Sequence, residues 1–290
     1  MFKFFLSFLL FVSLTGLGFA SNELVTMKHF SHLDKYVQEL VKDKGSKHVL
    51  LVFDDDDTLL QMPQALGSVG WWNWQTKLLK TDPKSKALVS HNFQGLIDVQ
   101  ELLLDMNYMT LTSPQIPLLL HKWQRQGVTT LVFTARSRKM SNATEHQFKH
   151  VGLKSGFKKY SVVTKNGTTS LPGAFHPCND QKMRPVMYQN GIYYASGQNK
   201  GLLLQCFLKQ TGKAKQYSAI LIIDDTLMND QDFYKAYQGM KGMDTIAVHY
   251  TKLADVKQEQ LNIKKLHAQM TKQWHQIKTV LANNLVEPAL

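Results

Sequence analysis

The chain has 290 residues, of which 43% are hydrophobic and 19% are charged, and its formal net charge is +12 at pH 7. This composition excludes an intrinsically disordered chain, and the length suits one α/β domain with an insertion or two small domains. The basic excess favours anionic partners such as phosphorylated substrates, nucleic acid or anionic lipid, although a merely soluble basic surface is an equally good interpretation.

Residues 1–20 differ in composition from the rest of the chain. They carry one charge, Lys3, followed by an apolar run that ends in small residues at Gly18 and Ala20. This layout is typical of a secretory signal peptide with cleavage after Ala20. An uncleaved membrane anchor is the alternative, but the run is short for a span and is interrupted by Ser, Thr and Gly. We therefore expect an exported protein, periplasmic or secreted, with no membrane span after cleavage.

The remaining chain alternates apolar strands with amphipathic helices. A helix is expected first, over residues 21–43. Strands are expected at 48–54, 129–134, 160–164, 219–224 and 244–250, with helices at 116–126, 142–150, 201–211 and 231–237 and a last helix over about 255–282. Apolar strands separated by helices predict a parallel sheet with right-handed crossovers, whose ligand lies at the carboxyl ends of the strands.

Two regions depart from this alternation. Residues 60–114 form an insertion after the first strand, with the stretch GWWNWQ at 70–75 and a helical pattern at 99–106. Its tryptophans either stack on a ring in the substrate or form the core of a small helical cap, and we expect at least two in the core. Residues 165–198 read as loops with a hairpin around 191–195.

Two cysteines and two histidines could bind a metal ion or form a disulfide, but their spacing does not decide between the alternatives. Cys178 and Cys206 form either one disulfide or two free thiols, and no Cys/His cluster has zinc spacing. His146 and His150 are four residues apart on a predicted helix. Because the HExxH pattern is absent, a surface pair is the better interpretation.

Four consecutive aspartates, Asp54 to Asp57, directly follow the first apolar strand. Repulsion and desolvation oppose such a cluster unless a cation or a reaction uses the carboxylates. A solvated acidic turn is the alternative, but such turns seldom follow a buried strand. A phosphoryl-transfer site would need a nucleophile, an acid/base group, a hydroxyl donor, a cation and further carboxylates for a metal ion.

The rest of the chain supplies these companions in order. Thr134 ends a predicted strand and leads into Ala135 and Arg136, Lys200 opens a predicted helix, and Asp224 and Asp225 end another strand. The motifs FDDDDTLL, FTARS, NKG and IDDTLMN together resemble the haloacid dehalogenase (HAD) superfamily over residues 46–250. They also resemble an uncharacterised bacterial branch of it.

This resemblance implies a HAD-like Rossmannoid α/β fold, with a parallel sheet flanked by helices and a small, mainly helical cap insertion. The core would comprise residues 21–59 and 115–290, and the cap residues 60–114. The implied activity is Mg²⁺-dependent hydrolysis of a phosphomonoester through an aspartyl-phosphate. Alternatives are a phosphotransferase, a nucleotidase, or a non-catalytic HAD-like binding protein. The partner would be a phosphorylated small molecule or a nucleotide, without a stable nucleic-acid complex.

The resemblance also implies roles for individual residues. Asp54 would be the nucleophile and Asp56 the acid/base. Thr134 would hold the phosphoryl oxygens, and Lys200 would be the neutralising cation. Substrate-binding positions would be Asp55, Thr58, Ala135 and Arg136, although Arg136 could equally be a surface residue at a helix start. The Mg²⁺ ligands would be Asp54, Asp56 through its backbone carbonyl, Asp224 and Asp225, with Asn229 orienting the Asp224 side of the site. Strand alternation points the side chains of Asp55 and Asp57 away from Asp54 and Asp56.

Overall fold

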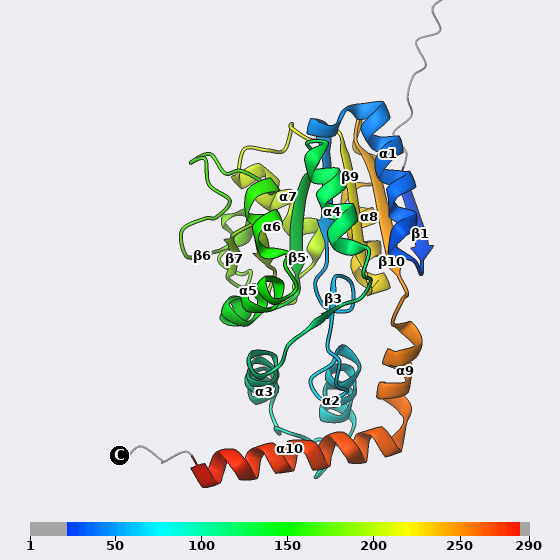
Figure 1. Cartoon of the computed structure of the whole chain (residues 1–290). Coiled ribbons are helices and arrows are strands. Elements are labelled where there is room, and N and C mark those ends of the chain that lie inside the picture. Colours follow the sequence, from blue (N-terminus) through cyan, green and yellow to red (C-terminus); the bar gives the residue numbers. More distant parts are fainter. Residues whose placement is uncertain (1–21, 285–290) are drawn as a thin grey trace, which may run out of the picture.

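The computed structural model describes residues 22–284, so the predicted signal peptide at 1–20 lies outside the described residues. Within residues 22–284, none of the helices combines the length and the apolar composition that crossing a bilayer requires. Figure 1 shows a sheet with helices on both faces, and a separate group of helices below the sheet edge where most strands end.

The sheet has eight strands in the order β1-β10-β9-β2-β5-β8-β7-β6. Six of them run parallel: β1 (Asn22–Met27), β10 (Asp244–Tyr250), β9 (Ala219–Asp224), β2 (Val49–Phe53), β5 (Thr129–Thr134) and β8 (Ile192–Tyr194). β7 (Val186–Gln189) pairs antiparallel with β8, and β6 (Ala174–Phe175) pairs antiparallel with β7. The predicted α/β class with a mostly parallel, helix-flanked sheet is confirmed, and this architecture is consistent with a HAD-like Rossmannoid fold.

Two apolar layers cover the faces of this sheet. One face packs against α1 (Leu33–Lys44), α4 (Ile116–Arg125), α5 (Ser141–His150) and α6 (Lys154–Tyr160). The other packs against α7 (Lys200–Gln210) and α8 (Leu227–Tyr237). All five residues of β2 are fully buried, because its alternate side chains enter the two layers. A strand buried on both faces is therefore a continuous apolar run rather than an alternating one.

The predicted N-terminal helix is wrong over its first part. Residues 22–27 form β1 at the sheet edge, parallel to β10, and the helix begins only at Leu33. The segment ELVTM contains β-branched residues that suit a strand, and β10 offers an otherwise unpaired edge to it. Helical spacing in residues 30–41 is real, but it does not extend back to residue 21.

The predicted strand at 160–164 is also wrong. α6 ends at Tyr160, and residues 161–164 are irregular. Val162 is fully buried in the second apolar layer without joining a ladder, because β8 already occupies the edge of β5. The expected hairpin is present as β7 and β8, joined at Asn190 and Gly191, which both have positive φ (51° and 80°). An Asn-Gly turn of this kind matches the twist of the flanking strands.

The insertion at 60–114 contains a short antiparallel pair, β3 (Leu60–Gln61) and β4 (Thr110–Leu111), and two helices, α2 (Val69–Thr81) and α3 (Phe93–Met106). The predicted final helix is two helices, α9 (Ala254–Asn262) and α10 (Lys264–Asn284), which break at Ile263. We call α2, α3, α9 and α10 the helical layer; it lies at the bottom of Figure 1.

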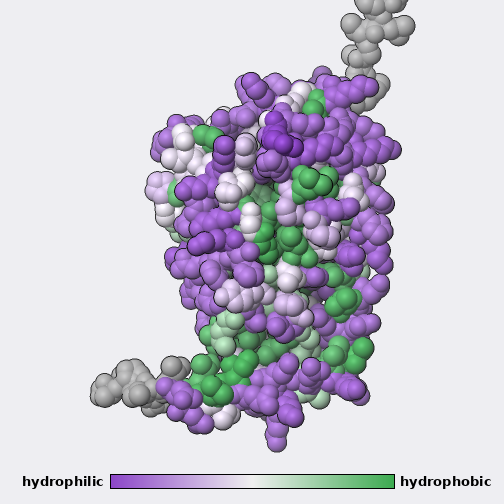
Figure 2. All heavy atoms as spheres, viewed as in Figure 1, coloured by the Kyte–Doolittle hydropathy of each residue, from purple (hydrophilic) through white to green (hydrophobic). Residues whose placement is uncertain are grey.

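The helical layer has an apolar core of its own. Trp71 and Trp74 of α2 are buried there against Leu96 and Leu103 of α3 and Met270 and Trp274 of α10. Ser68, the N-cap of α2, donates a hydrogen bond to Gln260 of α9 at 2.9 Å. Hydrophobic residues gather on the same lower part of the surface in Figure 2. The C-terminal helices, assigned above to the core, thus pack on the insertion.

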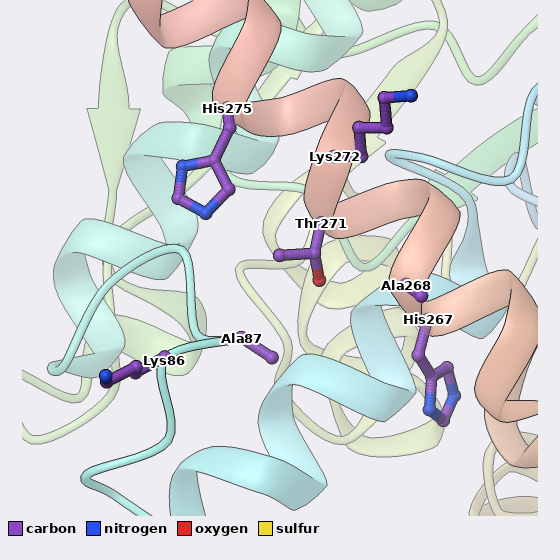
Figure 3. A pocket seen from close by; sticks show the side chains of 7 residues that line it. All are labelled: Lys86, Ala87, His267, Ala268, Thr271, Lys272 and His275. Atoms are coloured by element: carbon purple, nitrogen blue, oxygen red, sulfur yellow. The ribbon is translucent and has the colours of Figure 1, made fainter.

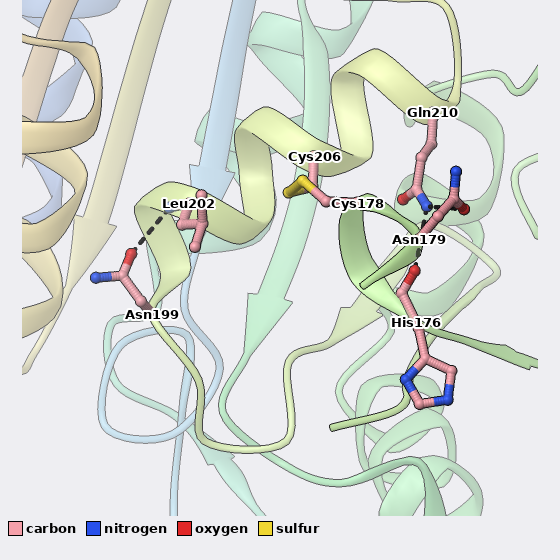
Figure 4. The surroundings of a disulfide bond; sticks show 7 residues. All are labelled: His176, Cys178, Asn179, Asn199, Leu202, Cys206 and Gln210. Carbon is pink, nitrogen blue, oxygen red and sulfur yellow. Dashed lines mark hydrogen bonds between the residues drawn. A yellow bond between two sulfur atoms is a disulfide. The ribbon is translucent and has the colours of Figure 1, made fainter. Parts of the chain in front are cut away.

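A disulfide joins Cys178 and Cys206, with Cα atoms 4.9 Å apart. It ties the loop before β7 to the buried side of α7, as Figure 4 shows. Gln210 of the same helix donates to the carbonyl of His176 at 3.3 Å, close to the bond. Of the two interpretations left open by the sequence, the structure has the disulfide, a bond typical of proteins outside the reducing cytoplasm.

Candidate active site

Carboxylates from two neighbouring strands meet at the carboxyl edge of the sheet. Asp54 follows β2, and its N–H donates to the Ile223 carbonyl at 2.9 Å, while Asp224 ends the adjacent β9. Lys200, the first residue of α7, bridges them: its Nζ is 2.5 Å from Asp54 Oδ1 and 2.6 Å from Asp224 Oδ2. All three side chains are buried. Residues far apart in the chain thus converge on one point.

Burial and mutual charge determine the protonation of this group. Burial raises the pKa of Asp54 well above its ordinary value; Lys200 opposes that rise, and Asp224 and Asp225 add to it. Burial alone would lower the pKa of Lys200, but Asp224 and Asp54 raise it above its ordinary value. Lys200 is therefore a permanent cation here, and any further cation beside Asp54 would favour the ionised, nucleophilic carboxylate.

Asp224, at the end of β9, and Asp225, in the loop that follows, are held by hydrogen bonds to their neighbours. Asp224 Oδ1 accepts hydrogen bonds from the Thr226 N–H and from Asn229 Nδ2, each at 2.9 Å. Lys257 of α9 donates to the carboxylate and to the backbone carbonyl of Asp225. Burial raises the pKa of Asp225 to about 6, against the opposing effect of Lys257. A lysine of the C-terminal helices thus contacts the reaction centre.

Arg136 is a buried residue of this centre and not a surface residue. Its Nη2 is 2.7 Å from Asp56 Oδ1 and its Nε is 2.8 Å from Asp56 Oδ2, a bidentate pair. Its Nη1 donates to Thr144 and Gln147 of α5 at 2.8 and 2.7 Å. The fork of the guanidinium therefore fixes the direction in which Asp56 points.

The two remaining aspartates lie beneath the surface of the site. Asp55 is fully buried, with Oδ2 3.2 Å from Nη1 of Arg136, and burial raises its pKa to about 7. This burial corrects the expectation that Asp55 binds substrate. Asp57 has a left-handed backbone (φ 57°), which interrupts the strand alternation. Burial, and then Asp225, raise its pKa to about 8, while Lys257 opposes the rise.

Two threonines brace the loops. Thr58 donates to Asp54 Oδ2 at 3.3 Å and is fully buried, so it supports the nucleophile rather than lining the cavity. Thr134 ends β5, and its hydroxyl accepts the Arg136 N–H at 3.2 Å. The loop after β8 holds this turn, because the Gly197 N–H donates to the carbonyl of Ala135 at 2.8 Å. Ala135 is exposed to the cavity.

A cavity of about 580 Å³ opens onto these residues. Asp54, Asp56, Asp225 and Asn229 form its floor. The helical layer supplies an apolar wall that includes Trp72, Phe93 and Ile97, and the loops of the sheet edge supply a basic wall. The insertion therefore lies across the cavity from the loops of the sheet edge.

The donor set fits a divalent cation of the magnesium type. Oxygen atoms of Asp54, Asp224 and Asp225 lie within 4.8 Å of one another, and all three residues are buried. Lys200 and Lys257 offset only part of this negative charge. Mg²⁺ prefers carboxylate, carbonyl and water oxygens. The other predicted ligand is the backbone carbonyl of Asp56, and the side chain of Asp56 pairs with Arg136.

A second groove in the helical layer offers no such chemistry. It lies between Lys86 and Ala87 on one side and His267, Lys272 and His275 of α10 on the other (Figure 3). No carboxylate is among the described residues that line it. His146 and His150 are exposed and flank the ring of Tyr108, in agreement with a surface pair.

Comparison with known proteins places the chain in a family. The family described as "Protein of unknown function (DUF2608)" matches residues 26–287. The chain belongs to this family. The matched region includes every residue of the candidate site, from Asp54 to Lys257.

Two individual proteins are also similar. A protein of Chlamydia pneumoniae described as "Putative outer membrane protein" is 27% identical over 160 residues, which are 55% of this chain. The match spans about half, 53%, of that relative's length. Among solved structures, cytosolic 5′-nucleotidase IIIB bound to cytidine aligns over 86% of this chain and 93% of that chain, with a TM-score of 0.37 and 12% identity.

Proposed function

We propose that this DUF2608 protein is a Mg²⁺-dependent phosphomonoester hydrolase that works through an aspartyl-phosphate. The observation that carries the proposal is the convergence of Asp54, Asp224 and Asp225 within 4.8 Å, with Lys200 bonded to both Asp54 and Asp224. This arrangement lies beside a cavity between the sheet edge and the helical layer, where electrostatic interactions are stronger than in bulk water.

The chemistry follows from these positions. A carboxylate oxygen of Asp54 attacks phosphorus, and the bond from phosphorus to the leaving oxygen breaks. Asp56, protonated from solvent before the reaction, gives that proton to the leaving oxygen. The resulting carboxylate then takes a proton from the water that attacks the phosphorus of the acyl phosphate. Phosphate leaves and the Asp54 carboxylate is restored.

The surrounding residues hold charge and position. In this mechanism Lys200 and the amide of Ala135 would stabilise the phosphoryl oxygens, and Arg136 would hold Asp56 in position through its two hydrogen bonds. Asp54, Asp224 and Asp225 would hold Mg²⁺, which when bound supplies positive charge to the phosphoryl group and to the nucleophile. A phosphotransferase would use the same first half-reaction, with an alcohol in place of water.

Hydrolysis of p-nitrophenyl phosphate by the purified protein tests the proposal. We expect turnover with Mg²⁺, loss of turnover with a chelator, and loss in Asp54→Asn with an unchanged circular dichroism spectrum. Asp43→Asn is the matched control, because Asp43 is exposed at the end of α1. Equal rates for Asp54→Asn and the parent protein, or no turnover by the parent, would favour a non-catalytic binding protein.

We further propose that the chain is exported. The disulfide between Cys178 and Cys206 supports this, as does the signal-peptide pattern of residues 1–20. N-terminal sequencing of the protein from a periplasmic or culture fraction should begin at Ser21. Recovery of the chain in the cytoplasm with Met1 intact would contradict export.

A further inference from the structure

The cavity extends beyond the reaction centre, and its two walls differ in chemistry. Arg184, Arg138 and Lys139 line the wall formed by the sheet-edge loops. Trp72, Phe93 and Ile97 line the facing wall formed by the helical layer. In the proposed mechanism Lys200 and the Ala135 turn contact the transferred phosphoryl group, so the side chains of both walls are available to the rest of the substrate.

Arg184 is held in place at the rim of the cavity. Its Nη2 donates to the carbonyl of Gly197 at 2.8 Å. Its backbone is clamped by Gln198, which accepts from the Arg184 N–H at 2.9 Å and donates to the Arg184 carbonyl at 3.0 Å. Among the described residues, no carboxylate forms an ion pair with Arg184 or Arg138. Two cavity-lining arginines thus keep their charge free for an anionic ligand.

The facing wall presents aromatic surface. The rings of Trp72 and Phe93 meet edge to face, with centroids 5.8 Å apart. Phe93 is 51% exposed, although an aromatic side chain of a helix would ordinarily be buried. A planar ring in the ligand would cover this surface and gain stacking energy.

We infer that the substrate is a phosphomonoester with an aromatic ring and a second anionic group, a combination found in a nucleoside bisphosphate. One phosphate lies at Asp54, the ring packs on Trp72 and Phe93, and the second phosphate contacts Arg184 and Arg138. This inference rests on the proposed function, because it assigns the reacting phosphate to Asp54.

The test compares kcat/KM for adenosine 3′,5′-bisphosphate, AMP and ribose 5-phosphate at low ionic strength. We expect the bisphosphate to exceed AMP about tenfold, the scale of one charge-assisted hydrogen-bonded contact, and AMP to exceed ribose 5-phosphate by a similar factor. Arg184→Gln should lower the first ratio, because only Arg138 then remains for the second phosphate, and Phe93→Leu should lower the second ratio. Lys182→Gln is the control, since Lys182 is exposed two residues away and does not line the cavity.

Equal kcat/KM values for the bisphosphate and AMP in the parent protein would overturn the inference. An equal fractional loss for both substrates in Arg184→Gln would do the same. Binding to Asp54→Asn by calorimetry separates this result from failure of the proposed function. Tighter binding of the bisphosphate than of AMP to that variant supports the inference even if no substrate is hydrolysed, and equal affinities refute it.

Discussion

Arg136 holds Asp56 through two parallel hydrogen bonds, Nη2 to Oδ1 at 2.7 Å and Nε to Oδ2 at 2.8 Å. The same guanidinium is anchored behind by Thr144 and Gln147 of α5. The buried guanidinium of Arg136 therefore orients the carboxylate of Asp56, the acid/base candidate. Helix α5 in turn fixes the position of that guanidinium. Asp55 contributes an ion pair to the same guanidinium, with its Oδ2 3.2 Å from Nη1 of Arg136.

Replacing Arg136 with lysine should lower kcat about 100-fold, because a point charge cannot hold Asp56 in the bidentate geometry. KM should change little, and the pH dependence of kcat should shift, which a purely structural defect would not produce. Arg125→Lys, at an exposed position on α4, serves as the control. An unchanged pH profile for Arg136→Lys would show that Asp56 is not the group that moves the proton.

Lys257→Met should make the stability of the protein depend more strongly on Mg²⁺. Without this lysine, Asp225 and Asp57 lose the cation that opposes their rise in pKa, and we expect the free energy of unfolding without Mg²⁺ to fall by about 3 kcal/mol. Mg²⁺ should then raise Tm more in the variant than in the parent, as measured by thermal denaturation. Lys265→Met is the control. A smaller Mg²⁺ effect on Lys257→Met would contradict this role.

Glu145 should make stability depend on pH. It accepts hydrogen bonds from Gln189 and Asn190 and pairs with Lys154 at 2.8 Å; burial would raise its pKa, but these partners lower it. A carboxyl whose folded pKa is lowered stabilises the protein above its unfolded pKa, and that contribution disappears as pH falls through the folded pKa.

Glu145→Gln should therefore cost about 1 kcal/mol of unfolding free energy near neutral pH, and the difference should narrow below about pH 4. Urea denaturation at several pH values measures it, with Glu39→Gln, exposed on α1, as the control. A difference that stays constant with pH would assign the loss to packing and not to the charge of Glu145.

The disulfide should stabilise the loop before β7. Cys178 and Cys206 are separated by 28 residues, and closing a loop of that length contributes roughly 3.6 kcal/mol in the chain-entropy model. The double variant Cys178→Ser/Cys206→Ser should lose about that amount in urea denaturation. If the parent protein under reducing conditions is as stable as under oxidising conditions, the bond does not form in solution.

Much of the sheet could be predicted because its central strands are continuous apolar runs that end in polar residues. Asp54, Thr134 and Asp224 are each found at such an end, and a parallel sheet brings those ends together. The segment at 160–164 has the same composition as a strand but finds no free edge, because β8 takes the place beside β5. Which of two apolar segments pairs is decided by tertiary packing and not by composition.

Two contacts of the site could not be predicted from the sequence, because each joins residues that are distant in the chain. Lys257 belongs to a helix rich in charged residues, and nothing local distinguishes it from its exposed neighbours. Its contact with Asp225 exists only because α9 descends from β10 along α2. Arg136 was placed at the site, but its pairing with Asp56 depends on the position of α5, which the spacing of motifs does not specify.

The most direct test of the central claim is to trap the covalent intermediate. The protein would be mixed with p-nitrophenyl phosphate and Mg²⁺, quenched with acid during turnover and treated with borohydride, which reduces an acyl phosphate to an alcohol. Mass spectrometry of the peptide that contains Asp54 should then show homoserine at position 54 and aspartate at positions 55, 56 and 57. Turnover with an unmodified Asp54, or with homoserine at another aspartate, would contradict the assignment of Asp54 as the nucleophile.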